Sequence, residues 1–119
     1  MAVTRISWPT LAARWRATPM PRIAYRHTVE DSVYVEPSLT RRGVGRLLLT
    51  ALIARAEARG FRQMVAVIGD SRQTASIELH RSLGFSPVGT LTNIGFKHGR
   101  WLDTVLMQRP LGAGADAPP

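Results

Sequence analysis

From residue 28 onward, apolar and polar positions follow first the period of a strand and then that of a helix. The run Ser32-Val33-Tyr34-Val35 is rich in β-forming residues and ends at Glu36-Pro37, which predicts a strand over 32–36 that leads into a turn. In the next segment, RRGVGRLLLTALIARAEARG, apolar residues recur at helical spacing and Gly60 stands where a helix ends. We therefore expect a helix over 43–59. The apolar run 64–68 lacks alternation, as expected for a central strand covered on both faces.

The second half of the chain repeats this alternation of elements. It predicts a helix near 73–83, ended by Gly84 with Phe85 packing back, and two strands near 86–94 and 101–109, joined at 95–99. A strand, a helix and a strand within about 40 residues predict a right-handed crossover between parallel strands. The expected fold class is α/β (α+β), in the order β-α-β-α-β-β, with a mixed sheet around a central parallel βαβ unit.

Neither end of the chain has a clear period. Residues 1–24 contain Pro9, Pro19 and Pro21, and we interpret them as an irregular arm with one short helix around Leu11–Arg16. Residues 111–119, with the sequence LGAGADAPP, predict a disordered tail. The folded domain is therefore expected over residues 25–110.

Composition narrows the class of protein. A chain of 119 residues with 45% apolar residues fits one globular domain. No apolar run approaches the roughly 18 residues that a membrane span needs, and the first segment has no uncharged apolar core of a secretory signal, so we expect a cytoplasmic protein without a membrane partner. The absence of cysteine excludes disulfides, thiolate-zinc sites and cysteine nucleophiles. His27 and His98 are too far apart to suggest a metal site, so no metal is expected.

The formal net charge of +8 comes almost entirely from arginine, because Lys97 is the only lysine. The arginines are scattered rather than gathered into a stripe with aromatic residues, which disfavours a specific nucleic-acid partner. Arg41, Arg42 and Arg46 lie close together in the sequence and favour a local anionic ligand instead.

These arginines surround two glycines, Gly43 and Gly45, at the predicted strand-to-helix junction. Free N–H groups and the positive end of the helix dipole favour phosphate at a helix start, and arginine adds charge-assisted hydrogen bonds. A pyrophosphate is the natural ligand. A Rossmann fingerprint would need a third glycine where Leu48 stands, and a P-loop would need a lysine that this segment lacks. A tight turn without a ligand is the alternative interpretation.

The segment 40–45, Thr-Arg-Arg-Gly-Val-Gly, resembles the Arg/Gln-x-x-Gly-x-Gly/Ala motif of the GNAT superfamily of N-acetyltransferases, with Thr40 in place of the usual Arg or Gln. The runs AYRHTVEDSVYV, AVIGDS, SIELHRSLGF, VGTL and GFKHGRWLDTVLMQR look like the phosphinothricin acetyltransferase branch over residues 24–109. The resemblance implies the C-terminal, acetyl-CoA-binding part of the GNAT fold, with the family's N-terminal half missing. Residues 1–24 resemble no element of the family, and a shifted frame or misplaced start upstream of Tyr25 is the favoured explanation.

The resemblance also implies an activity. It implies transfer of acetyl from acetyl-CoA to the amino group of a small amino-acid-like acceptor, of the phosphinothricin or methionine sulfoximine type, by direct attack. Glu30 matches the family's base, and His80 matches a histidine that protonates the departing thiolate or shapes the substrate pocket. Arg100 is a candidate for a substrate carboxylate and Trp101 is expected to pack. The implied coenzyme contacts are Val33, Tyr34, Val35, Arg41, Arg42, Gly43, Val44, Gly45, Arg46 and Gln73, the last in place of the usual asparagine.

Simpler interpretations stand beside these. Glu30 also fits a solvated acid on an edge strand, and His80 fits a hydrogen-bonded core histidine. Without earlier strands, the strand 32–36 would be an exposed edge and the helix 43–59 would lose part of its cover, which predicts a homodimer or a poorly soluble fragment. The second functional hypothesis is a non-catalytic remnant that still binds coenzyme A, and the third is an arginine-rich RNA-associated module.

Overall fold

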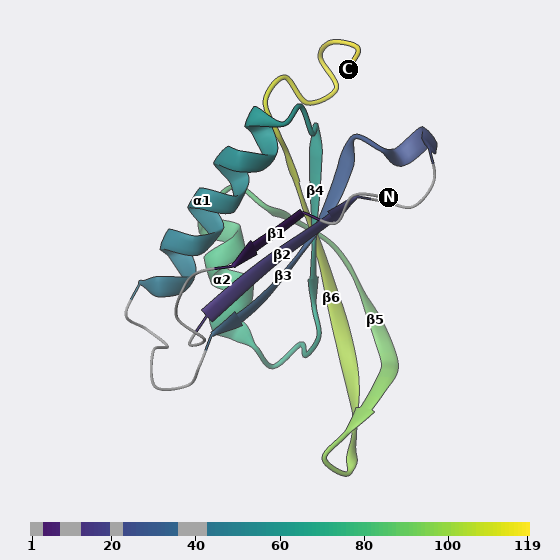
Figure 1. The fold of residues 1–119 in the computed structure, drawn as a ribbon. Coiled ribbons are helices and arrows are strands. Elements are labelled where there is room, and N and C mark those ends of the chain that lie inside the picture. The colour runs from purple at the N-terminus through teal and green to yellow at the C-terminus, as the bar shows by residue number, and fades with distance from the viewer. Residues whose placement is uncertain (1–3, 8–12, 20–22, 36–42) are drawn as a thin grey trace.

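A computed structural model describes residues 4–7, 13–19, 23–35 and 43–119. Its elements are the strands β1 (Thr4–Ser7), β2 (Ala13–Pro19), β3 (Thr28–Val35), β4 (Gln63–Ile68), β5 (Ser86–Lys97) and β6 (Arg100–Pro110), the helices α1 (Val44–Ala58) and α2 (Thr74–Ser82), and the 3-10 helix η1 (Ile23–Tyr25). The strands form one sheet in the order β1-β2-β3-β4-β6-β5 (Figure 1). Strands β3 and β4 run parallel, and the other neighbours run antiparallel.

The predicted order β-α-β-α-β-β is confirmed from β3 to β6. Two boundaries differ from the prediction. Strand β3 begins at Thr28 rather than Ser32, because its first residues gain hydrogen bonds from β4, a partner that the local pattern does not reveal. The connection between β5 and β6 is confined to His98 and Gly99, so Gly95 lies inside β5.

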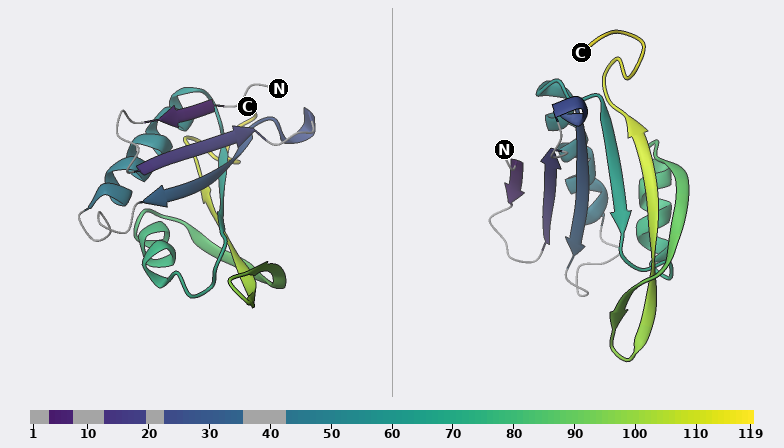
Figure 2. Two further views of the ribbon diagram at one scale, coloured as in Figure 1. Left: turned by 60° about the horizontal axis from the view of Figure 1, so that its bottom comes forward. Right: turned by 90° about the vertical axis from the view of Figure 1, so that its right-hand side faces the viewer.

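Both helices cover the same face of the sheet (Figure 2). Helix α1 packs against β2 and β3, whereas α2 packs against β4 and β5. Burial in β4 therefore alternates: Met64, Ala66 and Ile68 are buried beneath the helices, while Val65 and Val67 are only half-buried. The prediction of a central strand is right, but cover on both faces is wrong, since no described helix lies on the second face. We call this second face the open face.

The core lies between α1 and the sheet. Helix α1 contributes one apolar stripe, and the strands supply the opposite wall; burial of each such side chain stabilises the fold by about 1.5–3 kcal/mol. The stripe consists of Leu48, Leu49, Leu52, Ile53 and Ala56, and the wall includes Val29, Met64 and Met107. Gly84 has a φ of 94° after α2, and the buried Phe85 follows it, as the sequence predicts.

The N-terminal prediction of an irregular arm with a helix at Leu11–Arg16 is wrong. Strand β2 spans Ala13–Pro19 and pairs with β3 along Val29–Val35, and β1 pairs with β2 on its other side. Strand β3 is therefore an interior strand and not the exposed edge that was expected. Its partner is remote in sequence, and such pairing overrides the weak local helix propensity of this segment.

The C-terminal prediction of a disordered tail is also wrong. Leu111 is buried, and its N–H donates to the carbonyl oxygen of Arg62 at 2.8 Å. The Arg62 guanidinium donates to the carbonyl oxygens of Gly114, Ala117 and Pro118 at 2.8, 3.0 and 2.9 Å. A polar, glycine-rich composition favours disorder only when no other segment supplies hydrogen-bond partners, and here Arg62 supplies them.

Candidate functional site

Strands β3 and β4 separate beyond Asp31. Their ladder joins Thr28–Asp31 to Gln63–Ala66 and then ends, although β3 continues to Val35 and β4 continues to Ile68. Residues 32–35 pair with β2, and the last residues of β4 pair with β6, while Figure 1 shows β3 and β4 diverging. We call this opening the β3–β4 wedge. No described strand pairs with the side of β3 that faces this wedge along 32–35, so that side can pair with an extended ligand.

Helix α1 begins near the end of β3 with an uncapped first turn. Gly43 is its N-cap residue, with φ 75° and ψ 4°, and no side chain of the described residues caps the helix. A Cβ at Gly43 would meet nothing within 4 Å, so the left-handed backbone, rather than crowding, favours glycine here. The amides of Val44, Gly45 and Arg46 belong to the turn where N–H groups lack helical partners and the dipole favours anions. Arg41 and Arg42 lie outside the described residues.

The side chain of Arg46 joins the two helices. Its Nη1 atom donates to the Ser82 hydroxyl at 2.9 Å, and that hydroxyl donates to the Leu79 carbonyl oxygen at 2.7 Å. Arg46 thus connects the first turn of α1 to the last turn of α2. The sequence predicted Arg46 as a coenzyme contact and did not predict this link.

Glu30 and Asp31 point to opposite faces of β3, because consecutive residues of a strand alternate. Glu30 is exposed on the open face, opposite Val65 of β4, whereas Asp31 is buried on the helix face. Asp31 is the last residue paired with β4, so Glu30 stands one residue before the wedge opens. A carboxylate at this position is accessible to a substrate on the open face.

Asp31 contacts His80, the second residue that the resemblance implicated. His80 is 0% exposed and Asp31 is 1% exposed, and His80 Nε2 lies 3.1 Å from Asp31 Oδ1. His80 Nδ1 lies 2.8 Å from the Ser76 carbonyl oxygen, which only accepts, so Nδ1 carries a proton. The His80 ring also meets Phe85 edge to face at 4.9 Å. His80 therefore has the geometry of a hydrogen-bonded core histidine.

The pKa values of both Asp31 and His80 differ from their ordinary values. Burial raises the pKa of Asp31, and contact with His80 only partly offsets that effect. Burial acts to lower the pKa of His80, but the hydrogen bond and charge of Asp31, together with the Ser76 carbonyl, outweigh it and raise the pKa. Both groups hold protons more strongly than they do in water. Asp31 is not among the predicted site residues, although its position two residues after the apolar Val29 in a strand was a signal that both side chains face the core.

The loop after β4 is organised by a second aspartate that the sequence analysis missed. Asp70 Oδ1 accepts from the Arg72 N–H at 2.9 Å, and Asp70 Oδ2 accepts from Arg100 Nη2 at 2.6 Å. The Arg72 hydrogen bond and then Arg100 lower the pKa of Asp70. Gln73, the N-cap residue of α2, donates its N–H to the Asp70 carbonyl oxygen at 2.9 Å and is exposed. An Asp in a loop before a helix is typical of such a turn, and that was the available signal.

Arg100 and Trp101 occupy the start of β6. The contact with Asp70 engages one guanidinium nitrogen of Arg100. Trp101 contacts Phe96 edge to face at 5.0 Å but remains 62% exposed. Trp101 therefore packs against another ring, as expected, but at the surface and not in the core.

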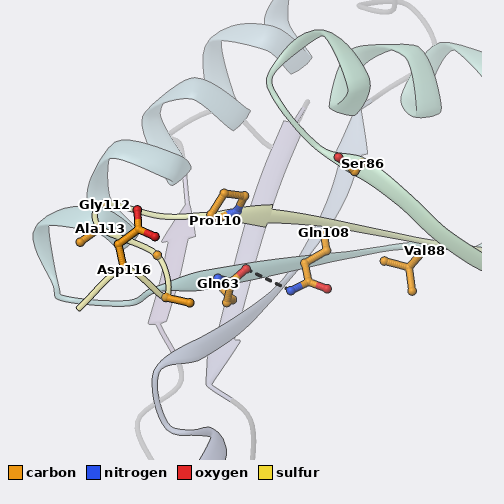
Figure 3. Close-up of a pocket in the computed structure, with 10 residues that line it drawn as sticks. Gln63, Ser86, Val88, Gln108, Pro110, Gly112, Ala113 and Asp116 are labelled. Carbon is orange, nitrogen blue, oxygen red and sulfur yellow. Dashed lines mark hydrogen bonds between the residues drawn. The ribbon is translucent and has the colours of Figure 1, made fainter. Parts of the chain in front are cut away.

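A pocket of about 510 Å³ lies elsewhere, at the opposite end of β4 from the wedge. Its lining includes Gln63 and Gln108, which share a hydrogen bond of 3.0 Å, and the backbone of residues 112–116 (Figure 3). Its lining includes the carboxylate of Asp116 but none of the site residues that the sequence predicts. We assign the candidate site to the wedge, because the wedge brings together an unpaired strand edge, a helix start and Glu30.

Two further sequence predictions bear on the kind of site. Within the described ranges, no group of three histidine, aspartate or glutamate side chains is arranged to hold a metal ion. Among the same residues, no helix is both long and apolar enough to cross a membrane.

Comparison with known proteins identifies the class that this fold and wedge define. The model of the acetyltransferase (GNAT) family matches residues 6–85, and the chain belongs to this family. The match begins within β1, so the interpretation that residues 1–24 resemble no family element is wrong from residue 6 onward.

Within the family, the chain is similar to acetyltransferases of amino-acid-like compounds. It is 58% identical over 94 residues to a phosphinothricin N-acetyltransferase of Alcaligenes faecalis, covering 79% of this chain and 48% of that protein. It is 47% identical over 104 residues to an L-methionine sulfoximine/L-methionine sulfone acetyltransferase of Pseudomonas aeruginosa, covering 87% and 58%. A crystal structure of a phosphinothricin acetyltransferase from Sinorhizobium meliloti in complex with AcCoA superposes with a TM-score of 0.86 at 50% identity, covering 91% and 58%.

The chain spans about half the length of the curated relatives it matches, with 48% of one and 58% of another covered. The fold comparison agrees with the predicted C-terminal part of the GNAT fold. The activity and substrates of the whole relatives are therefore taken up as proposals for this chain.

Proposed function

We propose that this chain provides the acetyl-CoA-binding part of an N-acetyltransferase, which transfers acetyl to the amino group of a small amino-acid-like acceptor. The observation that carries the proposal is the β3–β4 wedge, in which no described strand pairs with the β3 edge along 32–35; α1 is the next described element after this edge in the chain. Similarity to phosphinothricin and methionine sulfoximine acetyltransferases supports the acceptor class.

Acetyl-CoA fits these features as a two-part ligand. Its pantetheine arm is extended and carries amides, so it can lie in the wedge as an added strand against the backbone of Val33, Tyr34 and Val35. Its pyrophosphate is an anion, which favours the uncapped first turn of α1 at 43–46. In the proposal Arg41 and Arg42 add charge there, and Gln73 offers an exposed amide at the start of α2.

The reaction we propose is direct attack by the acceptor amine on the thioester carbonyl carbon. The C–N bond forms, the C–S bond breaks, the nitrogen loses a proton and the thiolate gains one. Glu30 takes the proton from nitrogen, because it is exposed on the open face next to the wedge. A backbone N–H within 33–35 stabilises the negative charge that develops on the carbonyl oxygen.

His80 receives a different role from the one that the resemblance implies. Because its ring is wholly buried and both nitrogens lie within hydrogen-bonding distance of protein oxygens, it is poorly placed to protonate a departing thiolate. We assign that proton to solvent and give His80 a structural position beneath the wedge.

Calorimetry with acetyl-CoA and a thiol-release assay with phosphinothricin and methionine sulfoximine test the proposal. We expect coenzyme binding and turnover with at least one acceptor. Glu30→Gln should lower turnover by about 10²–10⁴-fold, the usual contribution of a general base, while coenzyme affinity stays the same. Glu78→Gln is the matched control, because Glu78 is an exposed carboxylate on α2 whose partner among the described residues is Arg81; it should leave both readouts unchanged.

The other outcomes distinguish the alternatives. Binding without turnover supports the coenzyme-binding remnant, a hypothesis favoured by the half-buried Val65 and Val67 on the open face. Steeply salt-dependent RNA binding that coenzyme A does not affect supports the RNA-associated module. A folded protein that gives no heat with acetyl-CoA contradicts the proposal.

A further inference from the structure

The β3–β4 wedge lies between two packed groups of elements. On one side, α1 packs against β2 and β3; on the other side, α2 packs against β4 and β5. The parallel ladder that joins the groups stops at Asp31 and Ala66. Beyond that point, the angle between β3 and β4 depends on contacts other than strand pairing.

Two described side-chain contacts cross from one group to the other. His80 of α2 meets Asp31 of β3 at 3.1 Å, and Arg46 of α1 meets Ser82 of α2 at 2.9 Å. The Asp31–His80 contact is buried and lies at the last rung of the ladder, whereas the Arg46–Ser82 contact is exposed. Water competes with an exposed hydrogen bond far more than with a buried one, so the buried contact restrains the wedge more strongly.

The stability of the fold does not by itself explain why Asp31 and His80 are paired in the interior. Asp31 Oδ2 and Ser76 Oγ are both buried without a hydrogen-bond partner in the described structure. An unsatisfied buried oxygen destabilises a fold, and well-packed apolar residues in place of a buried polar pair are often neutral or stabilising. A pair that costs stability at the vertex of the wedge suggests a function in setting geometry.

We propose that Asp31 is a positioning residue for acetyl-CoA binding. Through His80 it fixes β3 relative to α2 where β3 leaves β4, and so fixes the backbone of residues 32–35 that receives the pantetheine arm. This inference rests on the proposed function, since it assumes that acetyl-CoA occupies the wedge. It assigns no direct substrate contact to Asp31.

Two ligands separate positioning from general destabilisation. Acetyl-CoA uses both the wedge and the start of α1, whereas ADP carries the diphosphate without the pantetheine arm. In calorimetry or NMR titration, Asp31→Ala should weaken acetyl-CoA binding by about tenfold or more and leave ADP binding unchanged. Asp31→Asn should stay within about threefold of wild type for both ligands, because its amide can donate to neutral Nε2 and keep the link.

Controls keep the result interpretable. Leu111→Ala removes a fully buried side chain at the end of the sheet remote from the wedge, so it should lower thermal stability without a selective loss of acetyl-CoA binding. If Asp31→Ala does not fold, the double variant Asp31→Val/His80→Leu removes both polar partners and fills their space, and it should fold yet bind acetyl-CoA selectively more weakly.

Equal losses for acetyl-CoA and ADP, or wild-type acetyl-CoA affinity in Asp31→Ala or in the double variant, overturn this inference. Either result leaves the proposed function standing, provided that the wild-type protein binds acetyl-CoA. If the wild-type protein binds ADP but not acetyl-CoA, the proposed function and this inference both fail.

Discussion

Asp31 and His80 share one hydrogen bond of 3.1 Å in the interior, and that bond requires a proton between them. Because Nδ1 of His80 must donate to the Ser76 carbonyl oxygen, the shared proton makes the pair either carboxylate and imidazolium or carboxylic acid and imidazole. Loss of this proton leaves a carboxylate facing a ring nitrogen lone pair. The pair is therefore sensitive to pH from its geometry alone.

We predict that the free energy of unfolding falls as pH rises above about 6.5, the unfolded pKa of histidine. The pKa values of both Asp31 and His80 are raised in the folded protein, so the folded state binds more protons than the unfolded state. For a raised pKa, the stabilisation is complete below the unfolded value, which is 3.8 for Asp31 and 6.5 for His80, and it is lost as pH rises through the folded value. The slope for one proton is at most about 1.4 kcal/mol per pH unit. Urea unfolding at a series of pH values measures it.

The double variant Asp31→Val/His80→Leu should flatten this dependence between about pH 6 and pH 9. His98→Asn serves as the control, because His98 is exposed in the β5–β6 turn with a φ of 54° that asparagine also tolerates. It should keep the wild-type slope. An unchanged slope in the double variant would assign the pH dependence to other groups.

Asp70 should give the opposite dependence at acid pH. Its pKa is lowered by the Arg72 N–H and by Arg100, so its stabilisation is present above the unfolded value of 3.8 and is lost as pH falls through the folded value. Asp70→Asn retains an oxygen for the Arg72 N–H but loses the charge beside Arg100, and it should shrink the acid-induced drop of the urea midpoint. Asp103→Asn is the control, because it changes another carboxylate, which accepts a hydrogen bond from the Asn93 N–H. If Asp103→Asn reduces the acid-induced drop of the urea midpoint and Asp70→Asn does not, the assignment to Asp70 is contradicted.

Arg62 should hold the C-terminal segment in place. Replacement by alanine removes three hydrogen bonds to backbone oxygens of residues 114–118. Because two of the three are exposed and contribute little, the free energy of unfolding should fall by about 1–2 kcal/mol. Limited proteolysis should then cut the segment after Leu111 faster than in the wild type, and thermal denaturation should show the lower stability. Arg81→Ala, which removes an exposed pair with Glu78 and no other described side-chain contact, should change neither. Equal cleavage rates for Arg62→Ala and the wild type would contradict this role.

Local pattern was enough to predict the elements from β3 to β6. Neighbouring residues carry the signals for these elements: the apolar stripe of α1, the glycine after each helix and the apolar run of β4. Helices α1 and α2 and strand β4 all form where these signals predict them. The glycines at 43 and 45 likewise marked the start of α1. Glu30 could be singled out by resemblance alone, because nothing in its own sequence context distinguishes it from an ordinary exposed acid.

Other features could not be predicted because their partners are remote in sequence. Strand β2 is held by pairing with β1 on one side and with β3 on the other, and its own arginines and tryptophan gave no clear period. The segment after Leu111 is held by Arg62, roughly half the chain away, so its composition suggested disorder. In both cases the stabilising group lies outside any window that a local pattern can cover.

Residue type and short spacing were sufficient to predict the family, the order of elements and the helix start that favours an anion. The three-dimensional structure was needed to show where β3 leaves β4, which face Glu30 occupies and what His80 contacts. These depend on strand register, and a shift by one residue would exchange the positions of Glu30 and Asp31 between the open face and the core.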